Sequence, residues 1–254
     1  HKENWDIPAW SPRQLTESIE NSLRRMKTEY VDLIQLHTCS EKMLRDGKVI
    51  ESLQKARKEG KARYIGYSGD GAAARYAIEC AAFDSLQCSV GLADQEAISL
   101  ILPLAREKEM GVIAKRPISN VAWQAQVKSV LPPRSLSEKI KQLNWSKLKN
   151  RFRSELKKIN EKVNPVPIYP NYSERFSKLD YEFLKGDLQT AVENAMRFTL
   201  SVSGIHTLII GTTKAEHFAA NVKSAQEGPL QPELYELIRA RWLAVAGSNW
   251  KGLG

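Results

Sequence analysis

Short apolar runs alternate with amphipathic segments along most of the chain. Residues 11–28 repeat apolar side chains every three or four positions, which predicts a helix with Ser11 as N-cap and Pro12 in the first turn. Further helices are predicted at 49–61, 72–83, 97–110, 187–201, 214–226 and 231–247. Strands are predicted at 30–37, 62–69, 85–90, 111–117 and 206–213.

This alternation is typical of a parallel sheet that is covered by helices. Outside one long irregular segment, the predicted strands lie roughly 20 to 30 residues apart, as in a (β/α)8 TIM barrel. A doubly wound sheet is the alternative, but no G-x-G-x-x-G sequence follows any predicted strand. Only five strands are predicted, so we expect an α/β fold that is an incomplete barrel with open edges.

Composition excludes several classes of protein. The chain has 254 residues, of which 42% are hydrophobic and 26% charged, as in ordinary globular domains. It contains no apolar stretch of about 18 residues that would span a membrane, and its first residues contain no apolar core of a signal peptide. The cysteines are too few and too scattered for a disulfide framework or a metal site. We therefore expect a reduced, cytoplasmic protein without a metal.

The net charge of +9 is concentrated in one segment. Residues 124–178 contain 13 Lys and Arg against 4 Asp and Glu, a difference of +9, so the remainder is neutral on balance. We interpret this segment as a basic, partly helical insertion within a single domain that spans residues 1–254. Such a charge run is usually a solvated face, although it could also attract an anionic partner. Nucleic acid is the weaker reading, because Trp145 and Phe152 fit the apolar side of a basic helix.

The strand ends resemble those of the aldo-keto reductase family. The matching segments occur in the family's order and cover residues 11–123 and 187–225. The resemblance implies that this chain supplies strands four to eight of the barrel, with the basic insertion after the seventh strand. The segments are LRRMKTEYVDLIQLH (23–37), KARYIGYSG (61–69), SLQCSV (85–90), GVIAKRPIS (111–119) and IIGTTKAEHFAANVKS (209–224).

The resemblance assigns a role to each candidate site residue. His37 would be the catalytic histidine that orients the substrate carbonyl, and Ser68 and Gln87 would hold the nicotinamide carboxamide. Arg116 lies in the loop that would bind the pyrophosphate. The adenosine phosphate would be held by Thr212, Thr213, Lys214, His217 and Asn221. From the residues alone, there are two alternatives. His37 could be a structural histidine at a strand end, and the residues from Thr212 onward could simply cap the helix predicted at 214–226.

The cofactor is expected to be NADP, with NAD as the alternative. Lys214 favours a phosphate, but His217 stands where the family often has an arginine, and a lone histidine is a weaker phosphate partner. Ala220 precedes Asn221 where the family often has a glutamate. Gly69 likewise follows Ser68 where an asparagine is common. Lys115 is unusual in its loop and could reach the pyrophosphate or form an ion pair inside the barrel.

The resemblance also implies that three catalytic groups are absent. In the family an aspartate, a tyrosine and a lysine come from the first three strand regions, and Lys27, Tyr30 and Asp32 of this chain do not occupy those positions. We therefore expect the first three βα units to be missing, through truncation, contribution by another chain, or degeneration. Since a general-acid tyrosine contributes roughly 10² to 10⁴-fold, the chain alone should show little activity.

The expected function is that of an oxidoreductase, namely reversible hydride transfer between a nicotinamide cofactor and a small carbonyl or alcohol substrate. The alternative is a catalytically inactive nucleotide-binding sensor, or a subunit that docks to a partner through the basic insertion. Substrate and oligomeric state cannot be derived from the sequence, because substrate loops vary freely on this fold.

Overall fold

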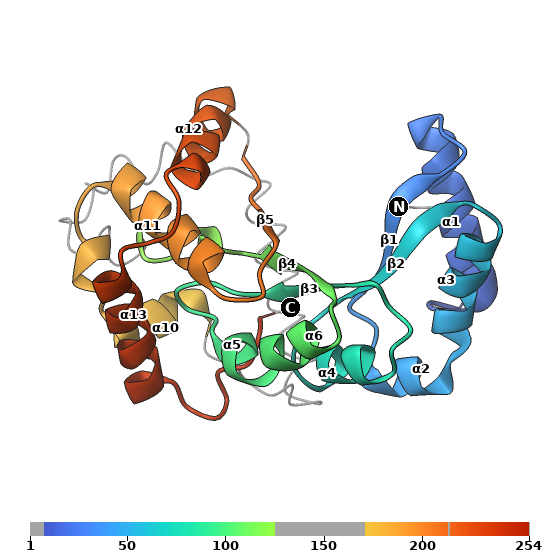
Figure 1. Ribbon diagram of the computed structural model, residues 1–254, viewed down its shortest axis with the longest axis horizontal. Coiled ribbons are helices and arrows are strands. Elements are labelled where there is room, and N and C mark those ends of the chain that lie inside the picture. The colour runs from blue at the N-terminus through green and yellow to red at the C-terminus, as the bar shows by residue number, and fades with distance from the viewer. Residues whose placement is uncertain (1–7, 125–170, 213, 254) are drawn as a thin grey trace, which may run out of the picture.

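Five parallel strands form one sheet in the order β1-β2-β3-β4-β5. Figure 1 shows the computed structural model, which describes residues 8–124, 171–212 and 214–253. Both the number of strands and their parallel direction confirm the prediction. The strands are β1 (Val31–His37), β2 (Ala62–Ser68), β3 (Ser85–Ser89), β4 (Gly111–Lys115) and β5 (Thr207–Ile209).

Helices connect and cover these strands at the predicted positions. Most bounds agree with the sequence pattern within a few residues, although α4 ends earlier than expected, because Ala81 adopts a positive φ of 53°. These helices are α1 (Pro12–Met26), α3 (Lys48–Lys58), α4 (Gly71–Glu79), α11 (Leu188–Ser201), α12 (Ala215–Gln226) and α13 (Pro232–Val245).

The first helix shows how local sequence sets an element's ends. The Ser11 side chain accepts a hydrogen bond of 3.2 Å from the backbone N–H of Gln14, so it caps α1 as predicted. Lys27 ends the helix in the left-handed conformation, and its N–H bonds back to the carbonyls of the last turn. The helix is held against the sheet through Ile19 and Leu23, which are buried with Ala56 of α3.

Two stretches differ from the expected pattern. A short helix α2 (Glu41–Asp46) fills the connection after β1, where no element is predicted. The single helix expected at 97–110 is divided into α5 (Glu96–Leu100) and α6 (Leu102–Glu107). Pro103 explains the division, since a proline ring clashes with the carbonyl of the preceding turn and supplies no N–H for a continuous helix.

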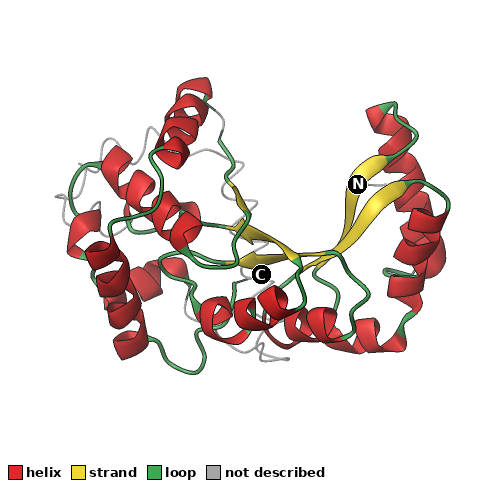
Figure 2. Cartoon of the chain, viewed as in Figure 1, coloured by secondary structure: helices red, strands yellow, loops and turns green. Residues whose placement is uncertain are grey.

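The sheet has one covered and one open face. Side chains that point to the helices are apolar and buried, among them Leu36, Ile65, Leu86, Val112 and Ala114. Figures 1 and 2 show the sheet curving away from this helical layer, so that its other face is concave. Edge strands β1 and β5 each pair with a single neighbour among the described strands, so the sheet does not close. The open concave face is where a barrel would have its interior.

Of the predicted basic insertion, the structure describes Gln124 and residues 171–178. Helix α10 (Tyr172–Leu179) begins within the predicted bounds 124–178 and ends one residue beyond them, and its Phe176 and Leu179 are buried in the main core. Trp145 and Phe152 lie outside the described residues. The structure corrects the reading of Arg175 as part of a solvated charge run, because this side chain is fully buried. A buried guanidinium requires a partner, and Asp94 provides it.

Two short 3-10 turns complete the described elements. The turn η2 (Glu182–Leu184) connects α10 to α11. The turn η1 (Ser119–Val121) follows β4 and leads to Trp123. Trp123 is buried and packs edge-on against Phe176 with ring centroids 5.2 Å apart. It is therefore a core residue.

Candidate functional site

Strand register brings three of the candidate residues into one row. His37 of β1 lies opposite Ser68 of β2, which lies opposite Gln87 of β3. Because paired residues of parallel strands point to the same face, the three side chains share the concave face of the sheet. They also stand at the carboxyl ends of their strands, where barrels of this type place their chemistry. The sequence predicts each position, and the register shows that they are neighbours.

Ser68 has an unsatisfied polar atom. Its side chain is buried, and its Oγ has no hydrogen-bond partner among the described residues. Leaving a buried hydroxyl unpaired costs about 1–3 kcal/mol, so such a group calls for an explanation. A bound carboxamide would supply it, since an amide offers both N–H donors and a carbonyl acceptor to a serine and a glutamine.

The next row toward the strand N-termini also contains buried polar atoms without a partner among the described residues. Gln35, Gly66 and Ser85 lie opposite one another, and Gln35 Nε2 and Ser85 Oγ are buried without a partner in the described part of the chain. Gly66 allows the two polar side chains to approach, because a Cβ at this position would overlap the Ser85 hydroxyl. The concave face is thus polar over two successive rows.

An ion pair lies beyond Ser68 and Gln87 on the side away from His37, near the end of β4. Lys115, at the end of β4, places its Nζ 3.0 Å from Asp70 Oδ2. Asp70 also accepts hydrogen bonds from the backbone N–H of Ser89 at 2.6 Å and from the Ser89 hydroxyl at 2.9 Å. Of the two roles that the sequence leaves open for Lys115, the structure shows the ion pair. Asp70 and Ser89 are not among the sequence candidates, because nothing in their local pattern marks them.

The loop after β4 has an unusual backbone. Arg116 has a φ of 60°, and Ser119, Asn120 and Val121 also have positive φ values of 44°, 55° and 56°. For a β-branched residue such as Val121 this conformation is strained, and strain of this kind concentrates at ligand-binding loops. Ser119 Oγ is also buried without a partner among the described groups. These features fit a loop shaped around a ligand, as the resemblance implies for this segment.

The predicted phosphate site lies at the start of α12. Lys214 is the N-cap residue, and its backbone N–H donates a 3.2 Å hydrogen bond to Thr212 Oγ1. His217 and Asn221 follow on the same side of the helix, four residues apart. Lys214 and His217 are exposed, as a surface phosphate site requires. Thr213 lies outside the described residues.

Comparisons with known proteins show the family of this chain. Residues 3–242 match the Aldo/keto reductase family. This match covers nearly the whole chain. The chain belongs to the aldo/keto reductase family.

Individual aldo/keto reductase relatives are distant. The uncharacterized oxidoreductase YqkF of Bacillus subtilis (strain 168) is 25% identical over 237 residues, which cover 91% of this chain and 67% of that protein. L-galactose dehydrogenase of Arabidopsis thaliana is 29% identical over 127 residues, or 47% of this chain and 39% of that protein.

Solved structures show the same fold. The holo form of the aldo-keto reductase AKR11C1 from Bacillus halodurans aligns with a TM-score of 0.63 at 21% identity, covering 97% of this chain and 73% of that one. The thermostable aldo-keto reductase Tm1743 aligns with a TM-score of 0.55 at 16% identity, covering 91% and 67%. The fold is therefore that of the aldo/keto reductase barrel, and the described residues form five parallel strands of it. The family typically uses NAD(P)H and acts on small carbonyl compounds.

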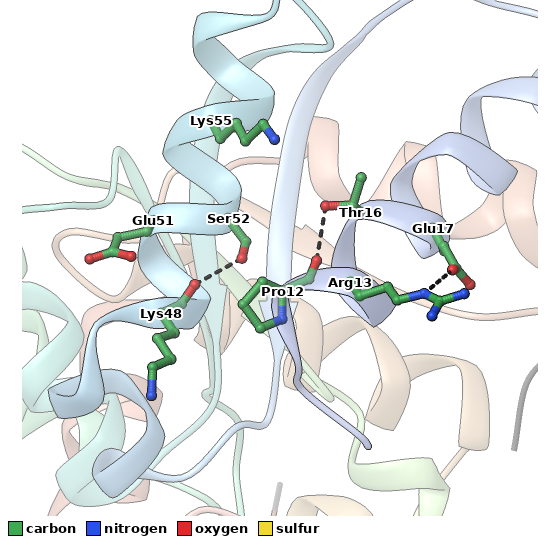
Figure 3. A pocket seen from close by; sticks show the side chains of 8 residues that line it. All are labelled: Pro12, Arg13, Thr16, Glu17, Lys48, Glu51, Ser52 and Lys55. Atoms are coloured by element: carbon green, nitrogen blue, oxygen red, sulfur yellow. Dashed lines mark hydrogen bonds and ion pairs between the residues drawn. The ribbon is translucent and has the colours of Figure 1, made fainter. Parts of the chain in front are cut away.

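Two of the cavities that the described residues line lie beside α1 in this aldo/keto reductase chain. One, of about 610 Å³, lies between α1 and the free edge of β1, and His37, Gln35 and Leu33 contribute to its wall. The other, of about 420 Å³, lies between α1 and α3 (Figure 3). Several of its polar groups bond within their own helices, as Arg13 does with Glu17. It contains none of the candidate residues, so we assign the chemistry to the concave face.

The two buried cysteines are poor nucleophiles. Burial raises the pKa of the Cys39 thiol to about 11 and that of Cys88 further, so neither is a thiolate nucleophile at neutral pH. The described residues contain no cluster of three His, Cys, Asp or Glu side chains that could hold a metal. They also contain no helix long and apolar enough to cross a membrane.

Proposed function

We propose that this chain binds a nicotinamide nucleotide on its concave face and takes part in reversible carbonyl–alcohol conversion. The observation that carries the proposal is the row formed by His37, Ser68 and Gln87, with the buried Ser68 hydroxyl lacking a partner among the described residues. When bound, the nucleotide would supply the hydride. Ser68 and Gln87 would hold its carboxamide, and His37 would orient the substrate oxygen.

The rest of the nucleotide would follow the strand ends toward α12. Arg116 and the strained backbone after it would bind the pyrophosphate, because consecutive N–H groups in such turns form anion-binding concavities. The adenosine phosphate would lie at the N-terminus of α12, held by Thr212, Thr213, Lys214, His217 and Asn221. We favour NADP over NAD, since Lys214 is the N-cap residue and a phosphate there gains both a cation and the helix dipole.

Turnover requires groups from outside the five strands. We propose that β1 to β5 take the places of strands four to eight of the family barrel, and that the aspartate, tyrosine and lysine come from further βα units. Support comes from the free edge of β1 and from the cavity beside it, whose lining includes the exposed Met26 and the partly exposed Leu33. A strand paired to that edge would cover these apolar side chains and satisfy the backbone groups. We further propose that residues 1–254 form one domain with 124–178 inserted.

Nucleotide binding tests the proposal directly. The chain has six tryptophans, so NADPH and NADH can be titrated while intrinsic fluorescence is followed. We expect saturable quenching, tighter with NADPH. Ser68→Ala should weaken binding about five- to tenfold, because it removes one hydrogen bond. Ser177→Ala, at an exposed position on α10, is the matched control and should bind as the wild type does. A chain that unfolds cooperatively yet binds neither nucleotide would refute the proposal.

Carbonyl reduction separates the enzyme from the inactive nucleotide-binding sensor. The chain alone should bind nucleotide without turnover, and addition of the three missing βα units should restore reduction of a small aldehyde. Binding that persists without turnover after the barrel is completed would instead favour the sensor.

A further inference from the structure

Asp70 and Lys115 form an ion pair that is largely shielded from water. Their side chains are 9% and 11% exposed, whereas most ion pairs among the described residues are far more accessible, such as Arg75–Glu79 at 61% and 42%. Ser89 fixes Asp70 with two hydrogen bonds, and Gly252 packs directly against its side chain, leaving no room there for a Cβ. Shielding strengthens the electrostatic effect of such a pair on its surroundings.

The pair lies beside the row of His37, Ser68 and Gln87, where we propose that the nicotinamide binds. Lys115 lies opposite Ser89, two residues beyond Gln87 along β3, so its side chain shares the concave face with Ser68 and Gln87. Strand spacing and rise place the Cα atoms of Gln87 and Lys115 about 8 Å apart. Asp94 and Arg175 are the charged residues that are fully buried in the described part of the chain, and they are paired with each other. Lys115 and Asp70 are therefore a shielded pair of charges beside a ring held at Ser68.

Charge near this ring distinguishes its two redox states. The nicotinamide ring carries a positive charge when oxidised and none when reduced. A cation beside it disfavours the oxidised form, and an anion favours it, while a balanced pair leaves the two forms close to their intrinsic ratio. We propose that the Asp70–Lys115 pair keeps the affinities of this site for oxidised and reduced nucleotide balanced, because each charge compensates the other. This inference rests on the proposed function, because it requires the ring to be held at Ser68 and Gln87.

The proposal predicts opposite effects for the two halves of the pair. Lys115→Met leaves the Asp70 carboxylate uncompensated and should favour NADP⁺ over NADPH about tenfold, relative to the wild type. Asp70→Asn leaves the Lys115 ammonium uncompensated and should favour NADPH about tenfold. The double variant is neutral again and should return toward the wild-type ratio. General damage to the site would weaken both nucleotides together, so it cannot produce shifts of opposite sign.

The experiment measures dissociation constants for NADPH and NADP⁺ by tryptophan fluorescence on the full chain. Urea unfolding checks that each variant folds, and Lys115→Gln is a second charge-removing variant that retains a donor for Asp70. Glu79→Gln, which removes one charge of the exposed pair on α4, is the control and should leave the ratio unchanged. Opposite shifts support the proposal. Shifts in the same direction, or ratios within twofold of the wild type while binding persists, overturn it. Failure of the wild type to bind either nucleotide overturns the proposed function and this inference with it.

Discussion

Arg175 is the side chain whose removal should most disturb the fold. It is fully buried, and its hydrogen-bond partners among the described residues include the Ala93 carbonyl at 2.9 Å, Asp94 Oδ1 at 3.4 Å and the Lys251 carbonyl at 2.6 Å. Its guanidinium also lies over the Trp250 ring, 5.4 Å from the centroid. One side chain thereby connects α10, the loop after β3 and the C-terminal segment. We expect Arg175→Met to lower the free energy of unfolding.

The size of this effect follows from what the substitution leaves behind. Asp94 would remain in the core without its cation, and removal of one partner from a buried pair costs about 3–5 kcal/mol. Asp94 retains the Tyr172 hydroxyl and the Leu253 N–H as donors, which keeps the expected loss near the lower value. Arg175→Met combined with Asp94→Asn removes the uncompensated charge. This double variant should therefore be more stable than Arg175→Met alone by about 1–3 kcal/mol.

Urea unfolding followed by circular dichroism measures these differences. Lys178→Met is the matched control, since Lys178 lies on the same helix but is exposed, and its loss should change stability by less than about 0.5 kcal/mol. The reasoning is refuted if Arg175→Met costs under about 1 kcal/mol, or if the two substitutions add without coupling.

Three further predictions concern packing, capping and pH. Gly66→Ala should lower the free energy of unfolding by about 1–3 kcal/mol, because the new Cβ overlaps the Ser85 hydroxyl. Addition of Ser85→Ala should recover part of that loss. If the two substitutions have additive effects in urea unfolding, this explanation is wrong. Ser11→Ala should cost about 1 kcal/mol by thermal melting, since it removes the cap of α1. Burial raises the pKa of Asp94 from 3.8 to about 7, although Arg175 opposes the rise. The folded state then holds the proton more tightly than the unfolded state, so stability should fall as pH rises through this window. The stability of Asp94→Asn should lack this pH dependence. If the unfolding free energies of the wild type and of Asp94→Asn change in parallel with pH, the prediction is refuted.

The sequence predicts the order of strands and helices because that information is local. Apolar runs bury the helix-covered face of β2 and β3, and residues such as Ser11 fix helix ends through contacts within four positions. Short α2 escapes prediction, since six residues hold too few turns to show a helical period. The division at Pro103 could have been predicted, because proline is a known interruption of helices.

The candidate site is predicted only as far as each residue can be assigned separately. His37, Ser68 and Gln87 are recognisable because each ends an apolar strand, and the structure adds that they are opposite one another. Asp70 and Lys115 are 45 positions apart, and their pairing depends on how β2, β3 and β4 align. No periodicity along the chain contains that information.

The burial of Arg175 also depends on a residue distant in sequence, and here the local sequence is misleading. Surrounded by lysines and arginines, it looks like one more solvated charge, and the burial of its neighbours Tyr172, Phe176 and Leu179 shows why it is not. The apolar side of α10 packs into the core, and Arg175 lies on that side, so it must carry its charge inward. Burial is tolerated because Asp94, 81 residues away, meets it there. A charged residue on the apolar face of a helix therefore predicts a buried ion pair with a residue that is distant in sequence, rather than an exposed side chain.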